Sequence, residues 1–313
     1  MIDRRDVLKL ASCTGALLIA ARLKEALAAE AMITRPVPST GEQLPVIGLG
    51  SSASFAREAR ADDVSALREV LRTLVSNGGK VFDTAPSYGA SEQVAGDIAN
   101  ELGIRDKIFW ATKVNVAGFT GHADPAAARA QIEASFTKFK VPKIDLIQVH
   151  NLGDVPTQLA ILKELKAAGR IRYLGVTTTN PGQYDDLLDI MRKEPLDFIG
   201  IDYAIDNRTA EEKILPLAID RKIGTLIYVP FGRNRLFNRV QGRDVPAWAA
   251  DFDAKTWSQF FLKFVVAQPG VTVVTPATSS ADHMLENIGG GIGRLPTPAQ
   301  RKRMIELIES LPS

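Results

Sequence analysis

Short runs of apolar residues alternate along the chain with longer segments in which apolar residues recur every three or four positions. Apolar runs of about four to eight residues predict buried strands, and the longer spacing predicts helices with one buried face. Eight strands are predicted, at residues 46–50, 80–84, 108–114, 144–150, 171–177, 198–202, 225–230 and 272–275. Helices are predicted near residues 62–77, 91–102, 125–140, 156–168, 182–193, 209–221, 255–267, 281–288 and 298–311.

The regular alternation of strand and helix predicts an α/β protein with a parallel sheet covered by helices. Eight repeats favour closure into a (β/α)8 TIM barrel over an open doubly wound sheet. The dinucleotide fingerprint of the open fold is also missing, because Gly48-Leu49-Gly50 leads into Ser51-Ser52. Turn residues divide segment 33–46 into two short extended pieces, which predict an N-terminal β-hairpin. Residues 231–254 lack clear periodicity and are a loop or lid candidate.

The N-terminus has the three parts of a secretory leader: a basic start, an apolar middle and a small-residue cleavage site at Ala26-Leu27-Ala28. Arg4-Arg5, followed by Val7-Leu8-Lys9, resembles a twin-arginine export signal. We therefore expect residues 1–28 to be an export signal peptide that engages the export machinery and gives a periplasmic or otherwise exported protein. The apolar stretch is shorter than the roughly 20 residues of a bilayer span, so no membrane span is expected in the mature chain. The alternative is an amphipathic helix that remains on the protein.

Charge and cysteine content narrow the range of partners. The formal net charge of the 313 residues is +2, which predicts no nucleic-acid partner. Without residues 1–28 the chain holds 33 basic and 33 acidic residues. The single cysteine, Cys13, lies in the leader, so the mature chain can form no disulfide. With three histidines and no cysteine cluster, no metal site is expected.

Four polar residues stand at or just after the ends of three successive predicted strands. Asp83 ends the second strand, Tyr88 follows in the next loop, Lys113 ends the third strand and His150 ends the fourth. The carboxyl ends of barrel strands meet at one mouth, so these side chains are expected to lie together. Singly, each has a simpler explanation, such as a structural Asp–Lys ion pair. Together they favour a catalytic site.

The chemistry of carbonyl reduction explains this set of residues. A carbonyl needs a hydride at carbon and a proton at oxygen, and a phenol with its ordinary pKa near 10 is a weak proton donor. The Lys113 ammonium would stabilise the Tyr88 phenolate and lower that pKa, and Asp83 would hold the ammonium in place. His150 would donate a hydrogen bond to the carbonyl oxygen. In the oxidation direction Tyr88 would accept the alcohol proton.

The segments around these residues resemble the catalytic motifs of the aldo-keto reductase family: Phe82-Asp83-Thr84-Ala85-x-x-Tyr88-Gly89, Thr112-Lys113, and residues 145–150. The opening 41–50 is similar to that family's first hairpin and strand. The resemblance extends from about residue 33 to the C-terminus and implies an aldo-keto reductase barrel domain over residues 32–313. It implies an NAD(P)H-dependent oxidoreductase that reduces an aldehyde, ketone or sugar carbonyl, with Tyr88 as proton donor.

The resemblance also implies a nicotinamide dinucleotide across the barrel mouth, with Tyr228 stacked on the nicotinamide ring. Thr177 and Thr178 stand where the family usually has Ser-Asn at the carboxamide, and Gly200 stands where a glutamine is usual. The other expected cofactor contacts are Gly50, Ser51, Asp83, Pro230, Phe231, Gly232, Arg233, Arg235, Thr275, Ala277, Thr278, His283, Glu286 and Asn287.

The choice between NADP(H) and NAD(H) depends on the 2′-phosphate, which needs a cationic partner. NADP-preferring members often carry lysine at the position of Ala277 and arginine at that of His283. Thr278 could still bind the phosphate, and Arg233 and Arg235 are further candidates. The resemblance to the family favours NADP(H) as the cofactor, and NAD(H) is the alternative.

Two other functions compete with carbonyl reduction. One is a cofactor-binding sensor or subunit of the same fold with little turnover. The other is a barrel hydrolase or lyase, which needs paired carboxylates or a metal cluster at strand ends. Asp83 and Asp202 are the only such pair in the sequence, and Lys113 is expected to neutralise the first.

Overall fold

The computed structural model describes residues 31–61, 63–117 and 121–312. The predicted leader, with Cys13, lies outside these residues. The unit Met32–Ser313 is compact. Within the described part of the chain, no helix combines the length and hydrophobicity that a membrane crossing requires.

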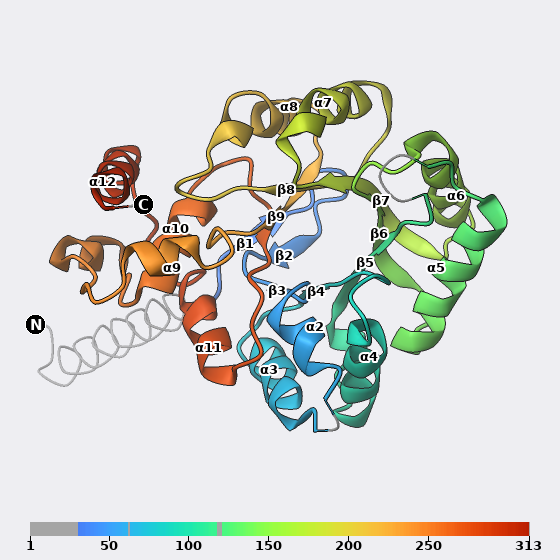
Figure 1. The fold of residues 1–313 in the computed structure, drawn as a ribbon, viewed down its shortest axis with the longest axis horizontal. Coiled ribbons are helices and arrows are strands. Elements are labelled where there is room, and N and C mark those ends of the chain that lie inside the picture. The colour runs from blue at the N-terminus through green and yellow to red at the C-terminus, as the bar shows by residue number, and fades with distance from the viewer. Residues whose placement is uncertain (1–30, 62, 118–120, 313) are drawn as a thin grey trace, which may run out of the picture. The chain divides into compact units, whose positions relative to one another are not determined.

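Eight parallel strands form the centre of the fold and are hydrogen-bonded in chain order (Figure 1). The two outer strands meet through bridges between Ile47 and Val274 and between Gly50 and Ala277, so the sheet closes into a barrel. The predicted (β/α)8 fold is therefore confirmed. The strands are β3 (Leu49–Gly50), β4 (Val81–Asp83), β5 (Phe109–Val114), β6 (Ile144–His150), β7 (Ile171–Thr178), β8 (Phe198–Asp202), β9 (Gly224–Tyr228) and β10 (Val273–Val274).

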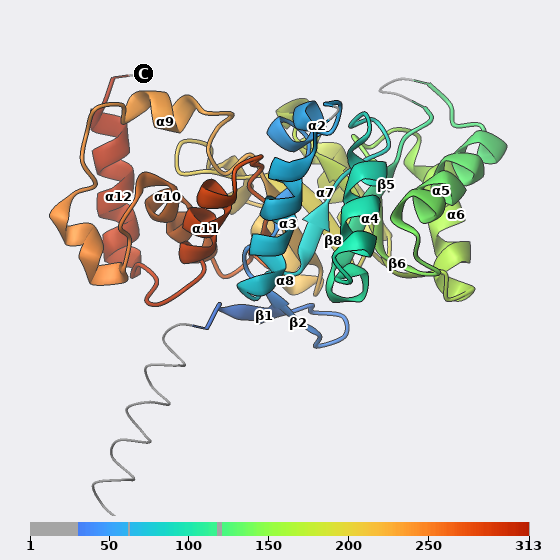
Figure 2. The same ribbon diagram turned by 90° about the horizontal axis from the view of Figure 1, so that it is seen from below.

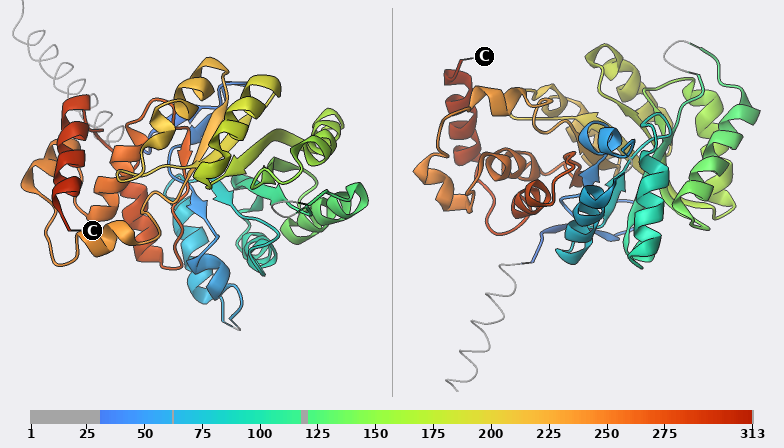
Figure 3. Two further views of the ribbon diagram at one scale, coloured as in Figure 1. Left: turned by 45° about the horizontal axis from the view of Figure 1, so that its top comes forward. Right: turned by 60° about the horizontal axis from the view of Figure 1, so that its bottom comes forward.

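Helices surround the barrel, and all of them except α2 and α9 lie in segments that the sequence predicts to be helical (Figures 1 and 3). They are α2 (Ser54–Glu58), α3 (Ser65–Ser76), α4 (Ser91–Glu101), α5 (Pro125–Phe139), α6 (Val155–Ala167), α7 (Tyr184–Lys193), α8 (Ile214–Asp220), α9 (Arg235–Arg239), α10 (Trp257–Val266), α11 (Ala281–Gly289) and α12 (Pro298–Ser310). Short 3-10 helices lie at Arg105–Lys107, Pro181–Gln183, Thr209–Glu211 and Ala247–Phe252.

The segment 231–254 differs from the predicted loop, because it contains α9 and the 3-10 helix Ala247–Phe252. Each is too short to repeat an apolar position several times, so periodicity could not reveal it. The last helix was easier to predict. Thr297 caps α12 by accepting a hydrogen bond from Gln300, whose side chain bonds back to Thr297, and Pro298 occupies the first turn.

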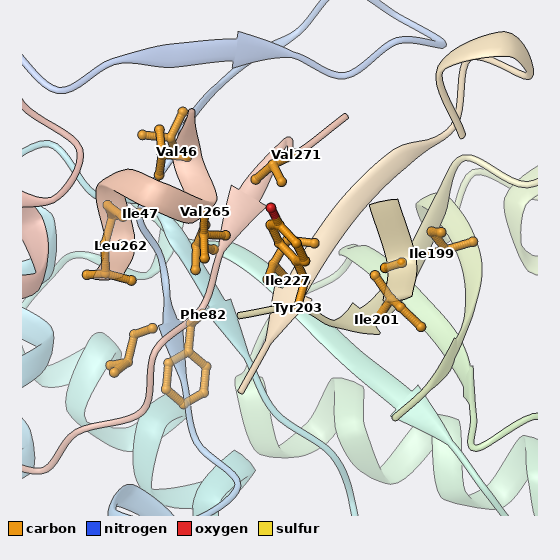
Figure 4. Close-up of a cluster of buried hydrophobic side chains, with 14 of the residues drawn as sticks. Val46, Ile47, Phe82, Ile199, Ile201, Tyr203, Ile227, Leu262, Val265 and Val271 are labelled. Atoms are coloured by element: carbon orange, nitrogen blue, oxygen red, sulfur yellow. The ribbon is translucent and has the colours of Figure 1, made fainter. Parts of the chain in front are cut away.

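Alternate strand residues divide the core into two parts. Inward-facing side chains fill the barrel, among them Val81, Phe109, Ala111, Leu146, Tyr173, Phe198, Leu226 and Val273. Residues between them point outward and pack against the helices. Figure 4 shows this outer part, where Ile47 and Ile227 of the barrel wall lie near Leu262 and Val265 of α10. Because side chains alternate along each strand, every second strand residue faces the barrel interior.

An N-terminal β-hairpin closes one end of the barrel, as predicted. It consists of β1 (Thr34–Pro36) and β2 (Gln43–Pro45), paired antiparallel. Val37 and Leu44 pack with the interior cluster, and Tyr173 donates a hydrogen bond of 2.6 Å to Glu42. Figure 2 shows the hairpin across one end of the barrel, with α2 and α9 towards the other. The carboxyl ends of the strands therefore lie at the end of the barrel opposite the hairpin, and form the mouth.

Candidate active site

Three neighbouring strands bring the four predicted catalytic residues together at the mouth. Asp83 ends β4, Lys113 lies near the end of β5, and His150 ends β6. The Lys113 Nζ lies 2.8 Å from the Asp83 Oδ2 and 5.2 Å from the centre of the Tyr88 ring. The Tyr88 and His150 rings meet edge to face, with centres 5.8 Å apart. The structure thus brings these four side chains together at the mouth.

Lys113 and Asp83 form a buried ion pair with 1% and 3% exposure, respectively. Lys113 also donates a hydrogen bond of 2.8 Å to the Thr84 carbonyl oxygen. Burial alone would lower the pKa of Lys113, but Asp83 and two phenol groups raise it. Burial raises the pKa of Asp83, while Lys113 and the Tyr228 hydroxyl oppose that rise.

The raised pKa of Lys113 favours a charged ammonium, whereas the raised pKa of Asp83 by itself would favour a neutral carboxyl group. Asp83 accepts a hydrogen bond on each carboxyl oxygen, from Lys113 on Oδ2 and from Tyr228 on Oδ1 at 3.2 Å. Two accepting oxygens are typical of an ionised carboxylate. We therefore treat the pair as ionised at neutral pH, with an ammonium fixed beside Tyr88.

The Tyr88 phenol is subject to two opposing effects. Burial raises its pKa, and the Lys113 ammonium, through its charge and a hydrogen bond, lowers it; the charge of Arg233 also lowers it. The net direction is upward, so the expected acidification by Lys113 is smaller than the effect of burial. Tyr88 therefore carries its proton at neutral pH, and the Lys113 ammonium beside it would stabilise a phenolate at this position.

His150 is a neutral imidazole at physiological pH. Burial, and then the charge of Lys113, lower its pKa to about 3. Its Nδ1 is enclosed and has no hydrogen-bond partner among the described residues. A neutral imidazole carries its proton on one nitrogen, and a proton on Nε2 would make that nitrogen a hydrogen-bond donor.

The expected cofactor contacts of the first and fifth strands of the barrel lie at the same mouth. Ser51 follows β3 and is 1% exposed, and its hydroxyl has no partner in the described structure. A side chain on Gly50 would come within 2.5 Å of the Thr275 carbonyl oxygen, so this position needs glycine. Thr177 and Thr178 end β7, where Thr178 donates a hydrogen bond of 2.6 Å to Gln183. The Thr178 hydroxyl is therefore already engaged.

The loop after β9 contains the next group of expected contacts. Tyr228 ends the strand, and the chain then passes Pro230 and Phe231 with left-handed backbone at Val229, Gly232, Arg233 and Asn234. Arg235 pairs with Asp206 at 2.7 Å. Arg233 is exposed and forms no ion pair with any residue described. Of the two arginines, Arg233 is the one whose charge remains available at the mouth.

The remaining expected contacts run from β10 into α11. Thr275 is buried, and Ala277 bridges to Gly50. The Thr278 hydroxyl accepts a hydrogen bond of 3.1 Å from the Ser280 amide, just before α11 begins. His283 is exposed, Glu286 accepts a hydrogen bond of 3.0 Å from Ser258, and Asn287 is 3% exposed. These residues therefore form one continuous segment beside β3.

Sequence reasoning missed Gln148, which lies on β6 two residues before His150. Its side chain is fully buried and donates a hydrogen bond of 2.8 Å to the Tyr228 hydroxyl. A polar residue at an inward position between Leu146 and His150 was the available signal. In the described ranges, no group of three or more His, Cys, Asp or Glu residues is placed to hold a metal ion.

A model of the Aldo/keto reductase family matches residues 46–297. The chain is 32% identical over 213 residues to the aldo-keto reductase YhdN of Bacillus subtilis; the match covers 65% of this chain and 63% of that protein. Its fold is similar to that of an aldo-keto reductase from Klebsiella pneumoniae solved with NADPH, with 22% identity, a TM-score of 0.73, and coverage of 88% of this chain and 96% of that one.

A glycerol dehydrogenase from Gluconobacter oxydans is also similar in structure, with 22% identity and a TM-score of 0.69, covering 90% of this chain and 95% of that one. At such identities the two solved structures support the fold alone, whereas the family match covers most of the chain and includes the strand ends that carry Asp83, Lys113 and His150. The chain belongs to the aldo/keto reductase family.

Proposed function

We propose that this protein is an NAD(P)H-dependent oxidoreductase that reduces an aldehyde, ketone or sugar carbonyl, with Tyr88 as the proton donor. One observation carries the proposal: an ammonium held at 2.8 Å by Asp83 lies beside the Tyr88 ring, with His150 against the same ring. An acid, a group that stabilises its conjugate base and a hydrogen-bond donor are what protonation of a carbonyl oxygen requires.

The residues around the mouth fit a nicotinamide dinucleotide. The buried Ser51 hydroxyl has no partner within the described chain, and Tyr228 presents a half-buried ring at the end of β9. Arg233 offers an exposed cation. These groups would hold the ribose, the nicotinamide ring and a phosphate, respectively. We favour NADP(H), as in the Klebsiella structure solved with NADPH; NAD(H) is the alternative because Ala277 and His283 supply no permanent charge.

A nicotinamide held by these residues would supply a hydride for the carbonyl carbon. His150 Nε2 donates a hydrogen bond to the substrate oxygen, orienting and polarising the carbonyl. Tyr88 then transfers its phenolic proton to that oxygen, and the Lys113 ammonium stabilises the phenolate that remains. Solvent at the mouth returns a proton to Tyr88 before the next cycle. Asp83 keeps Lys113 in place throughout.

Titrating the purified chain with NADPH and with NADH tests this proposal. Binding should quench the fluorescence of Trp110, Trp248 and Trp257, and NADPH should bind more tightly than NADH. NADPH should then be oxidised steadily when an aromatic aldehyde is added. Binding without turnover over a broad panel of aldehydes, ketones and sugars would favour the sensor alternative. The absence of both binding and turnover would end the proposal.

Residues 1–28 direct export to the periplasm in this proposal, on the strength of the Arg4-Arg5 pair and the apolar stretch behind it. Replacing both arginines by lysine preserves the charge and removes the twin-arginine pattern. The double variant should therefore stay in the cytoplasm, whereas the unaltered chain should be recovered from the periplasm as a shortened protein. Equal periplasmic recovery of the two would show that this pair is not an export signal.

A further inference from the structure

Gln148 begins a chain of hydrogen bonds that ends at the ammonium beside Tyr88. The Gln148 Nε2 donates to the Tyr228 hydroxyl oxygen at 2.8 Å. That hydroxyl donates to the Asp83 Oδ1 at 3.2 Å, and the Asp83 Oδ2 accepts from Lys113 at 2.8 Å. Gln148 and Tyr228 therefore reach the proposed acid–base group from inside the barrel, behind the four residues at the mouth.

The Tyr228 ring occupies space that Gly200 leaves open. A Cβ atom at position 200 would lie 2.4 Å from the ring Cε2 and 2.7 Å from the Tyr228 hydroxyl oxygen. Any side chain there would displace the ring. The ring thus lies across the barrel, with its hydroxyl directed inward and part of its surface still exposed at the mouth. Gly200 permits this orientation, and the two hydrogen bonds of the hydroxyl fix it.

The direction of the hydrogen bond between Gln148 and Tyr228 determines whether Tyr228 can donate to Asp83. A phenol hydroxyl has one proton and can donate it to one acceptor at a time. Because Gln148 donates to the phenol oxygen, the Tyr228 proton is free to point at Asp83. The opposite Gln148 amide orientation would put Oε1 against the hydroxyl and draw that proton away from Asp83. In the observed arrangement Oε1 is enclosed with no partner among described residues, so Tyr228 is the only hydrogen-bond partner of this side chain.

We propose that Gln148 is a positioning residue that acts through the Tyr228 hydroxyl, fixing the ring that receives the nicotinamide and tying it to the Asp83–Lys113 pair. The inference rests on the proposed function, because it assigns a purpose to the orientation of Tyr228. Cofactor binding and proton donation are then linked through one phenol. A disturbance at Gln148 should affect NADPH affinity and the turnover rate together, although Gln148 touches neither reacting group.

A double-mutant cycle tests this inference. Gln148→Met keeps a similar length and removes the donor, and losing one buried hydrogen bond of this kind corresponds to about a tenfold change in an equilibrium or rate. We expect the NADPH dissociation constant to rise about tenfold and kcat to fall about tenfold. In a Tyr228→Phe background the same substitution should change both by less than about twofold, because the hydroxyl through which Gln148 acts is already gone.

Gln158 provides a matched control. It is another fully buried glutamine, on α6, and it bonds to the backbone of Val116 and Gly153, away from Tyr228. Gln158→Met should lower the melting temperature but leave the NADPH dissociation constant within about twofold of the unaltered protein. A purely structural role for Gln148 predicts this same pattern for Gln148→Met, which would overturn the inference.

The outcomes also separate this inference from the proposed function. If the unaltered protein binds and oxidises NADPH but Gln148→Met does so equally well, the inference fails and the function stands. If the effects of Gln148→Met and Tyr228→Phe simply add, Gln148 does not act through the hydroxyl and the inference also fails. Should Gln148→Met not fold, Gly200→Ala replaces it: displacement of the ring should again raise the dissociation constant about tenfold, and an unchanged value overturns the inference.

Discussion

Tyr88→Phe is expected to lower kcat for carbonyl reduction by about 1,000-fold, within the range of about 100- to 10,000-fold typical of a lost general acid. The substitution removes the proton donor and keeps the ring that packs edge to face on His150. The NADPH dissociation constant should stay within about twofold, because the phenol oxygen is proposed to act on the substrate and not on the cofactor. Stopped-flow or steady-state measurement of NADPH oxidation gives kcat, and fluorescence titration gives the dissociation constant.

Tyr173→Phe is the matched control for this experiment. Tyr173 bonds to Glu42 and Thr40 at the closed end of the barrel, so losing its hydroxyl should leave kcat unchanged. The pH profile gives a second check. Burial raises the pKa of Tyr88, so reduction should be insensitive to ionisation of this residue near neutral pH and should decline only above pH 10 or so, as the phenol loses its proton. A Tyr88→Phe variant retaining a tenth or more of kcat would assign the proton to another donor.

Lys113→Met is expected to lower the free energy of unfolding by about 3–5 kcal/mol, because it leaves the Asp83 carboxylate buried without its counter-ion. Both side chains are almost fully enclosed, so water cannot replace the lost ammonium. Urea unfolding at about pH 7 measures this change. Adding Asp83→Asn to Lys113→Met should recover part of the loss, since the double variant buries no unpaired charge.

The sign of the pH dependence follows from the same pair. Without Lys113, burial raises the pKa of Asp83 above its unfolded value of about 3.9, so the folded variant binds this proton more tightly than the unfolded chain does. The deficit relative to the unaltered protein is then fully present above the raised pKa and shrinks as the pH falls through it. Lys163→Met, at the exposed pair with Glu194, should cost no more than about 1 kcal/mol. A similarly small loss for Lys113→Met would contradict a buried ionised pair.

The alternation of strands and helices made most of the barrel predictable, because inward and outward positions of a strand differ by one residue. Leu146, Gln148 and His150 face inward on β6, while Ile147 and Val149 join the outer core. The helices α2 and α9 escaped prediction, since five residues cannot establish a helical period. A buried lysine on α10 was not predicted either. Lys263 is fully buried and donates hydrogen bonds to the Ile292 and Arg294 carbonyl oxygens, and the spacing of apolar residues does not indicate such contacts.

The candidate site was predictable wherever a polar residue ended a strand, as at Asp83, Lys113 and His150. It was less predictable where the important property was a missing side chain. Gly200 first stood out as a departure from the family pattern, and only the structure shows that the Tyr228 ring fills its place. The pairing of Arg235 with Asp206 was equally hidden, because partners 29 residues apart in the sequence are brought together only by the fold.

The N-terminal hairpin packs across the amino ends of the barrel strands, opposite the mouth that carries Asp83, Lys113 and His150. We therefore expect substrate and product to enter and leave at the mouth, away from the hairpin. The hairpin end is therefore a suitable attachment point. Because Cys13 is the sole cysteine of the full chain, a protein prepared without residues 1–28 and carrying Lys143→Cys, at an exposed position just before β6, would attach to a resin through one residue. The tethered enzyme should keep the KM of the free one, and a raised KM would mean that molecules also enter from below.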